Sequence, residues 1–253
     1  MRNKVVLYLC VAAFLLAGCG AKNAAGDGST NSAASVGNHD LGNALNLVLG
    51  SDETPSVFSS YHMDVTLNSP TASTDEKSVV NEVTQIAADV AGQDVHIVQT
   101  DPGATAPKEG FIIGDKEYKI VDGAPQEMMG QIAMSWAMWP LKVTMAYAYP
   151  VYFAEKTGTE QIAGRNADVY AFDTNKASAA ASNSAMSSMG LGDLTQGKGT
   201  VWIDQETGAM LKLDMTYTAK VYDSNQAEIG TGDGSIQIEL SQIGQTTVVS
   251  PVQ

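Results

Sequence analysis

The stretch GTVWIDQETGAMLKLDMTYTAKVYDSNQAEIGTGDGSIQIELSQI, residues 199–243, gives the clearest indication of the fold class and is called the decisive stretch below. It contains three runs in which apolar and polar residues alternate, which is the pattern of strands with one buried face. The side chains expected on that face are Leu211, Leu213, Met215, Tyr217 and Ala219, followed by Ile236, Ile238 and Leu240. Residues 204–208 and 223–226 separate the runs, and their Asp, Asn, Ser and Gly residues are typical of hairpin turns. The stretch therefore predicts an antiparallel meander with one apolar face.

The same alternation recurs, in shorter pieces, through the part of the chain that precedes this stretch. The expected strands lie at 57–68, within 78–100 with a turn near residues 92–94, within 110–123 around a turn at residues 114–116, and within 160–174. In the first of them Tyr61, Met63, Val65 and Leu67 share one face. The chain from Leu41 onward thus predicts one mainly antiparallel domain.

Three segments of helical character interrupt the strands. Residues 41–50 carry apolar residues at helical spacing and end on a glycine. Residues 131–153 are rich in Met, Trp and Tyr, with two prolines that divide them into one or two short helices. Residues 175–192 are rich in Ala and Ser, and we expect a helix that stops at Gly190. Because helices can cover the apolar face of a sheet, the predicted fold class is α+β.

The N-terminal segment has the features of an export signal. Arg2 and Lys4 precede the apolar run of residues 5–17, which is too short to span a bilayer comfortably. Residues 16–19, Leu-Ala-Gly-Cys, resemble a bacterial lipobox, in which the signal is removed before the cysteine and the cysteine is acylated. We therefore expect residues 1–18 to be a lipoprotein signal peptide and Cys19 to be the lipidation site. A plain secretory signal with an incidental cysteine, or a short N-terminal membrane anchor, is the alternative.

Residues 19–40 are expected to form a lipidated N-terminus and a flexible linker. They consist largely of Gly, Ala, Ser, Asn and Thr, and such a composition buries too little apolar surface to fold. The linker is followed by the single domain of residues 41–253. This order predicts an extracytoplasmic protein that is anchored to a cell membrane, or to an outer membrane, through the lipid on Cys19.

The charge of the chain excludes one class of partner. Its formal net charge is −14, and removal of residues 1–18, with two basic residues and no acidic ones, takes it to −16. Nucleic acid binding requires clustered Lys and Arg, so a nucleic acid partner is not expected. Attraction to a membrane is expected to come from the acyl group on Cys19 alone.

The sequence offers little for catalysis or metal binding. It has no G-x-S-x-G or H-E-x-x-H motif, and the three histidines, at positions 39, 62 and 96, lie far apart in the sequence. The segment GTGDGS, residues 230–235, is interpreted as a loop or bulge, because no lysine is placed to hold a phosphate. The acidic residues of 223–228 lack the glycine and the ligand number of a calcium loop, so a hairpin turn is preferred there. We predict no enzyme activity, no cofactor and no metal.

Two segments resemble a known family. The run VWIDQETGAMLKLDMTY, residues 201–217, is similar to the late hairpin of the LolA/LolB/LppX-type bacterial lipoproteins, whose members include LppX/LprG-like proteins. Residues 155–174 are similar to the strand pair that precedes that hairpin in the family. The resemblance implies a strongly curved antiparallel β half-barrel, with helices covering its concave face. It also implies binding of acyl chains or lipidated molecules in a cavity beneath those helices.

The residues expected to line such a cavity come from the Met/Trp-rich segment and from the decisive stretch. They are Met134, Trp136, Met138, Trp139, Leu141, Met145, Leu211, Leu213 and Met215. Methionine adapts to irregular apolar shapes and suits a lipid or other hydrophobic small molecule. The expected function is non-covalent lipid binding, as a carrier or chaperone. The alternative is a domain with a solid core that interacts with, or senses, another envelope protein.

Overall fold

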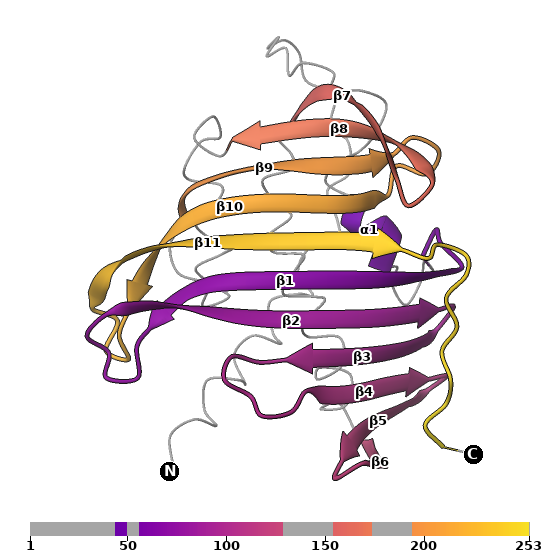
Figure 1. Ribbon diagram of the computed structural model, residues 1–253, viewed down its shortest axis with the longest axis horizontal. Coiled ribbons are helices and arrows are strands. Elements are labelled where there is room, and N and C mark those ends of the chain that lie inside the picture. The colour runs from indigo at the N-terminus through magenta and orange to yellow at the C-terminus, as the bar shows by residue number, and fades with distance from the viewer. Residues whose placement is uncertain (1–43, 50–55, 129–153, 174–193, 253) are drawn as a thin grey trace, which may run out of the picture. The chain divides into compact units, whose positions relative to one another are not determined.

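The computed structural model describes residues 44–49, 56–128, 154–173 and 194–252, which form one short helix and eleven strands (Figure 1). Helix α1 spans Ala44–Leu49, as the spacing of residues 41–50 predicts. The strands are β1 Ser60–Ala72, β2 Val79–Ala91, β3 Asp94–Thr100, β4 Lys108–Ile113, β5 Lys116–Val121, β6 Ala124–Met128, β7 Glu155–Ile162, β8 Arg165–Asp173, β9 Leu194–Asp204, β10 Met210–Tyr222 and β11 Glu228–Ser241.

All eleven strands belong to one antiparallel sheet, in the order β6-β5-β4-β3-β2-β1-β11-β10-β9-β8-β7 (Figure 1). Strands that are neighbours in this order are also consecutive in the chain, apart from β1 and β11, which pair with each other at the centre. Among the described residues β6 and β7 end this order, so the sheet is open. The antiparallel meander is therefore confirmed. The helices predicted within 131–153 and 175–192 lie outside the described residues.

The decisive stretch forms β9, β10 and β11, joined by the two predicted turns. In the first turn the amide of Gly208, at a φ of 76°, donates to the carbonyl of Asp204 over 2.9 Å. In the second turn a carboxylate oxygen of Asp223 accepts the amides of Asn225 and Ala227. Glu228 forms an ion pair with Lys220 at 2.7 Å. These contacts confirm a hairpin turn at residues 223–226.

The glycine-rich residues 230–235 belong to β11, so of the two alternatives, loop or bulge, the loop is wrong. The register between β10 and β11 shifts between Val221 and Tyr222, next to Gly230. The irregularity expected from the glycines therefore lies at the start of the strand, and the rest of the segment stays in the ladder. Glycine is needed in this part of β11 because neighbouring side chains occupy the volume that a Cβ atom would fill.

Gly199 of β9 likewise has no room for a side chain. A Cβ atom at this position would lie 2.3 Å from the carbonyl oxygen of Asp214 and 2.6 Å from Cζ of Phe172. The Phe172 ring thus occupies the volume that a side chain at position 199 would need. The sequence pattern of β9 alone does not reveal this requirement.

Gly199→Ala is expected to destabilise the fold by about 1–3 kcal/mol, because the backbone of β10 must shift to admit the methyl group. Gly158→Ala in β7 is the matched control, since a Cβ there meets nothing within 4 Å. Urea unfolding of both variants measures the difference. Equal midpoints for the two variants would contradict the close approach of Phe172 to β9.

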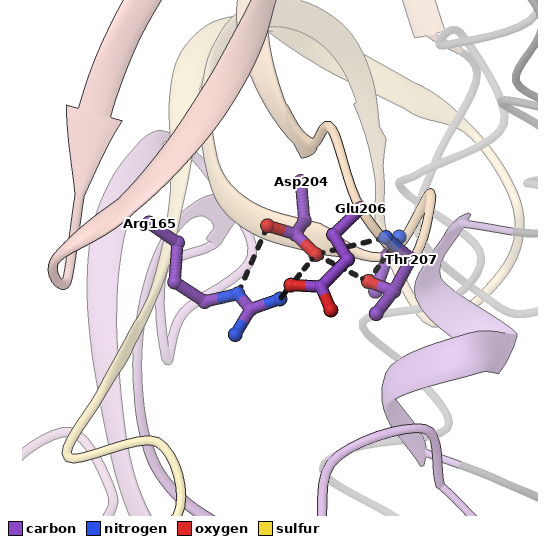
Figure 2. Close-up of polar contacts among 5 residues, drawn as sticks. Arg165, Asp204, Glu206 and Thr207 are labelled. Carbon is purple, nitrogen blue, oxygen red and sulfur yellow. Dashed lines mark hydrogen bonds and ion pairs between the residues drawn. The ribbon is translucent and has the colours of Figure 1, made fainter.

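A cluster of charged residues ties two hairpins together at one end of β8 and β9 (Figure 2). The guanidinium of Arg165 donates from Nε and Nη2 to the two carboxylate oxygens of Asp204, over 2.9 and 2.8 Å. It also pairs with Glu206 at 2.8 Å and lies over the ring of Phe58. The backbone amide and the hydroxyl of Thr207 donate to Asp204 as well. Asp204 is buried, so these donors replace the water that its carboxylate loses.

Candidate ligand-binding face

A row of apolar side chains crosses six neighbouring strands on one face of the sheet. Residues that lie opposite one another in register share a face. The row, which we call the central row, consists of Ile86, Val65, Ile238, Leu213, Val201 and Tyr170, from β2, β1, β11, β10, β9 and β8 in turn. Every member is buried, and four of the six have no exposed surface. The sheet thus presents a continuous apolar surface.

A second row lies beside the central row. It contains Leu67, Ile236, Met215, Gly199 and Phe172, again in register across neighbouring strands. These two rows, together with Met63, Leu240 and Leu211, are called the apolar face below. The face is composed of aliphatic, methionine and aromatic side chains, which contact each other through dispersion and remove apolar area from water.

The predicted cavity residues of the decisive stretch lie on this face. Leu211, Leu213 and Met215 have exposed fractions of 0, 0 and 2% and belong to the same hydrophobic core cluster. The structure thus brings these three together and buries them. The other candidates, Met134, Trp136, Met138, Trp139, Leu141, Met145 and the lipidation site Cys19, lie outside the described residues.

Helix α1 lies on the same side of the sheet as the apolar face. The hydroxyl of Tyr61 in β1 donates to the carbonyl of Val48 over 3.1 Å, and the amide of Val57 donates to the carbonyl of Leu47. Burial raises the pKa of the Tyr61 hydroxyl, which is therefore protonated at any physiological pH. In the described part of the chain α1 is the only helix, and it has six residues.

A cluster of polar side chains adjoins the apolar face near β7 and β8. Lys156 pairs with Asp168 at 2.7 Å, and the side-chain Nε2 of Gln205 donates to the same carboxylate over 2.6 Å. Asp168 lies opposite Ile203 in register and is buried. Burial and the neighbouring Asp168 raise the pKa of the Tyr170 hydroxyl. The apolar face therefore ends, on this side, at hydrogen-bonded polar groups.

A pocket of about 530 Å³ lies at the other end of these strands and has a different character. Its lining consists of Asp173, Gln196, Gly197, Lys198, Thr216, Tyr217, Thr218, Asp233 and Gly234. Thr218 accepts a hydrogen bond from Gln196 and donates one to Asp233. The lining combines charged, hydroxyl and glycine residues and contains none of Leu211, Leu213 and Met215.

The opposite face of the sheet carries a feature that the sequence reasoning missed. His62, Asp89 and His96 lie side by side on β1, β2 and β3. His62 Nδ1 is 2.7 Å from Asp89, His96 Nδ1 is 3.6 Å from the other oxygen of Asp89, and His96 Nε2 is 2.9 Å from Glu109. The two histidines are thus neighbours of one carboxylate, although they lie far apart in the sequence. The turn predicted near residues 92–94 already places Asp89 opposite His96, so this pair could have been found.

The surroundings of His62 favour its charged form. Burial by itself lowers the pKa, but the hydrogen bond to Asp89 and the charges of Asp64 and Asp89 outweigh burial and raise the pKa above its ordinary value of 6.5. His62 Nε2 faces Asp64 at 3.3 Å, so a carboxylate stands against each ring nitrogen. On the other neighbouring strand, β11, Ser241 lies opposite His62 and Glu239 lies opposite Asp64.

A stabilising contribution from His62 is expected at mildly acidic pH. Because the pKa in the folded state is raised, the contribution is fully present below the unfolded pKa of about 6.5 and is lost as the pH rises through the folded pKa. Urea midpoints measured between pH 5 and 9 test this. The difference between the wild type and His62→Gln should shrink with rising pH, whereas a difference that is constant with pH would contradict it.

Among the described residues, no group of three or more His, Cys, Asp or Glu residues could hold a metal ion. Within the same ranges, no helix is long and apolar enough to cross a membrane.

Comparison with known proteins gives likenesses in structure. The chain matches no protein-family model and no curated protein by sequence. It is similar to lipoprotein LppX from Mycobacterium tuberculosis, with a TM-score of 0.44 and 17% identity over 83% of this chain and 98% of LppX. It is also similar to LprF from Mycobacterium bovis, with a TM-score of 0.42 and 16% identity over 78% of this chain and 91% of LprF.

A third solved structure comes from the wider superfamily. It is a LolA superfamily protein from Nitrosomonas europaea, with a TM-score of 0.24 and 11% identity over 78% of this chain and 91% of that protein. The likeness is to LolA/LppX-type proteins.

Proposed function

We propose that the chain is an exported lipoprotein that binds an acyl chain, or a similar hydrophobic molecule, against its apolar face. The observation that carries the proposal is the central row, an unbroken line of apolar side chains across six strands of an open sheet. Each CH₂ group transferred from water to such a surface contributes about 0.8 kcal/mol, so a long chain needs no ionic anchor. Binding is non-covalent and involves no catalytic step.

The burial of the apolar face is also compatible with the second candidate function, a solid-core domain that interacts with another protein. Leu211, Leu213 and Val201 have no exposed surface, so residues of this chain already cover them. A domain with a solid core would have the same burial and would act through its outer surface on another envelope protein. In the binding proposal, by contrast, a ligand takes the place of covering residues or lies between them and the sheet.

Ligand binding is tested with the chain from Gly20 onward, which contains the whole compact unit of residues 36–253. After delipidation, cis-parinaric acid is titrated and its fluorescence is followed, because the dye brightens in apolar surroundings. We expect saturable binding and a higher melting temperature with ligand, since a ligand at 100 times its Kd stabilises by about 2.7 kcal/mol. No binding and no thermal shift would favour the solid core.

A matched pair of variants assigns the binding to the apolar face. Met215 and Thr216 are adjacent in β10, but Met215 is buried on the apolar face and Thr216 is exposed on the other. Met215→Glu places a carboxyl group among apolar side chains and is expected to abolish dye binding, whereas Thr216→Glu is expected to leave it unchanged. Circular dichroism checks the fold of both. Equal binding by folded Met215→Glu and wild type would overturn the assignment.

The lipid anchor is tested separately in the full chain. We propose that Cys19 is acylated, with signal removal before it, and that residues 20–40 form the linker to the domain. The support is the order of a basic start, a short apolar run and a lipobox-like Leu-Ala-Gly-Cys. In bacteria grown with labelled palmitate, the wild type should carry label and sediment with membranes, and Cys19→Ser should do neither. Label that persists in Cys19→Ser would exclude acylation at this residue.

A further inference from the structure

Strand β2 is longer than one of its two neighbours. It pairs with β1 along its whole length, from Val79 opposite Ala72 to Ala91 opposite Ser60. It pairs with β3 only from Gln85 to Ala91. Residues 79–84, called the β2 edge below, therefore have a described strand on one side only.

The hydrogen-bonding direction of the β2 edge follows from the register. The amide of Gly92 donates to the carbonyl of Ser59, and the amide of Ser73 donates to the carbonyl of Ser78. Because bonded pairs alternate along an antiparallel ladder, even-numbered residues of β2 bond to β1. The amide and carbonyl groups of Val79, Asn81 and Val83 point away from β1, and no strand among the described residues pairs with them.

The side chains of the β2 edge suit an added strand. Val80 and Val83 are 39% and 45% exposed, among the most exposed large apolar residues of the described chain. They lie on opposite faces of the strand, so a neighbouring strand would cover both. Val79, Val80, Val83 and Thr84 are β-branched, and such residues favour the extended backbone that pairing requires.

The inner side of the β2 edge is held in place. The side-chain amide of Asn81 donates to the carbonyl of Asp233 in β11 over 3.0 Å. The Val79 side chain lies over β11, where a Cβ on Gly232 would meet it at 2.8 Å. Near the hairpin tips, the hydroxyl of Ser224 donates to Glu76 over 2.9 Å. The edge is thus already extended and supported, which lowers the ordering cost of adding a strand.

The two strands that end the sheet are protected in ways that the β2 edge is not. Strand β7 has a register shift between Lys156 and Gly158 and carries charged residues along its length. Strand β6 has five residues, one of them Pro125. Bulges, charges, prolines and short length are the devices that keep sheet edges from pairing. The β2 edge has no proline, no register shift and a single charge, Glu82.

We propose that the β2 edge binds an extended, basic polypeptide segment as an added β-strand. The ladder supplies affinity through the outward amides and carbonyls, and Val80 and Val83 supply apolar contact. Residues 73–85 carry Asp75, Glu76 and Glu82 against Lys77 alone, so a cationic segment is favoured. A second copy of this chain is a poorer occupant, because each copy carries a net charge of −14.

The proposal is tested with the full chain in phosphatidylcholine nanodiscs, with empty nanodiscs as the blank. The probe is the acetylated nonapeptide KVTVKVTVK, and its controls replace each K by E or methylate every backbone nitrogen. We expect saturable binding of the basic peptide alone, with slowed amide exchange in residues 79–84. Absence of binding, equal binding of the methylated peptide, or protection elsewhere would overturn the proposal. A dimer of the chain with residues 79–84 protected before peptide is added would also overturn it.

Two substitutions at one position separate the ladder from the side chain. Val83→Pro removes an outward amide and leaves the bonds to β1 in place, whereas Val83→Ala keeps the amide and shortens the side chain. Loss of an interface hydrogen bond worth about 1.4 kcal/mol weakens binding about ten-fold, so we expect at least that loss for proline and a smaller one for alanine. Equal affinity of the two would exclude pairing through this amide. If Val83→Pro fails to fold, the exchange measurement on the wild type decides.

Discussion

Asp204→Ala is expected to destabilise the folded chain by about 3–5 kcal/mol, the usual cost of removing one partner from a buried ion pair. The side chain of Asp204 is 2% exposed and that of Arg165 is 25% exposed. The substitution removes the acceptor for both nitrogens of the guanidinium and for the amide and hydroxyl of Thr207 (Figure 2). Nε of Arg165 and both donors of Thr207 then lose this acceptor, whereas Nη2 of Arg165 keeps its bond to Glu206.

The control for Asp204 is Glu206→Ala in the same turn. Glu206 pairs with the same guanidinium, but its side chain is 80% exposed, so its removal should cost about 1 kcal/mol or less. Urea unfolding followed by circular dichroism measures both variants. Equal losses in the two variants would contradict the role assigned to the buried pair.

The same carboxylate is expected to contribute to acid sensitivity. Burial by itself raises the pKa of Asp204, but hydrogen bonds from Arg165 and Thr207 outweigh burial and lower the pKa below its ordinary value of 3.8. A lowered folded pKa means that the stability from this group is present above the unfolded pKa and is lost as the pH falls through the folded pKa. The stability difference between the wild type and Asp204→Ala should therefore shrink only in strongly acidic solution.

Leu213→Ala is expected to destabilise the chain by about 2–5 kcal/mol, because it leaves a void in the middle of the central row. Leu213 lies between Ile238 on β11 and Val201 on β9, and all three side chains are fully buried. Collapse around the void is limited, since the backbone ladder on both sides fixes the distance between the strands. This variant tests whether the centre of the apolar face is packed as the register indicates.

Thr216→Ala is the matched control for Leu213 in the same strand. Thr216 is exposed on the opposite face, and surface substitutions of this kind change stability by about 0.5 kcal/mol or less. The readout is again the urea midpoint. A loss for Leu213→Ala no larger than that for Thr216→Ala would contradict the burial of the central row.

The sequence predicts the local units of this fold better than their assembly. The alternation in residues 199–243 predicts β9, β10 and β11, with Leu211, Leu213 and Met215 on the buried face, because strand periodicity and turn residues are local signals. The turn near residues 92–94 is found for the same reason. Strand β6 was not predicted, because Ala124–Met128 contains a proline and no clear alternation.

The sequence pattern does not predict which distant strands and turns contact each other. Strand β1 pairs with β11, which lies at the other end of the domain, and no local signal specifies that register. The contact of Arg165 with Asp204 joins two turns 39 residues apart. The array of His62, Asp89 and His96 depends on two registers at once, so histidines that look isolated in the sequence become neighbours. Whether the predicted lining residues of 131–153 meet the apolar face stays a prediction.

Ligand binding at the apolar face is best tested by the native mass of the chain from Gly20 onward, produced in bacteria and never exposed to detergent. We expect a complex with one hydrophobic molecule in stoichiometric amount, recovered by organic extraction and absent from folded Met215→Glu. A mass equal to that of the polypeptide alone, unchanged after incubation with phospholipid, would contradict ligand binding at the apolar face.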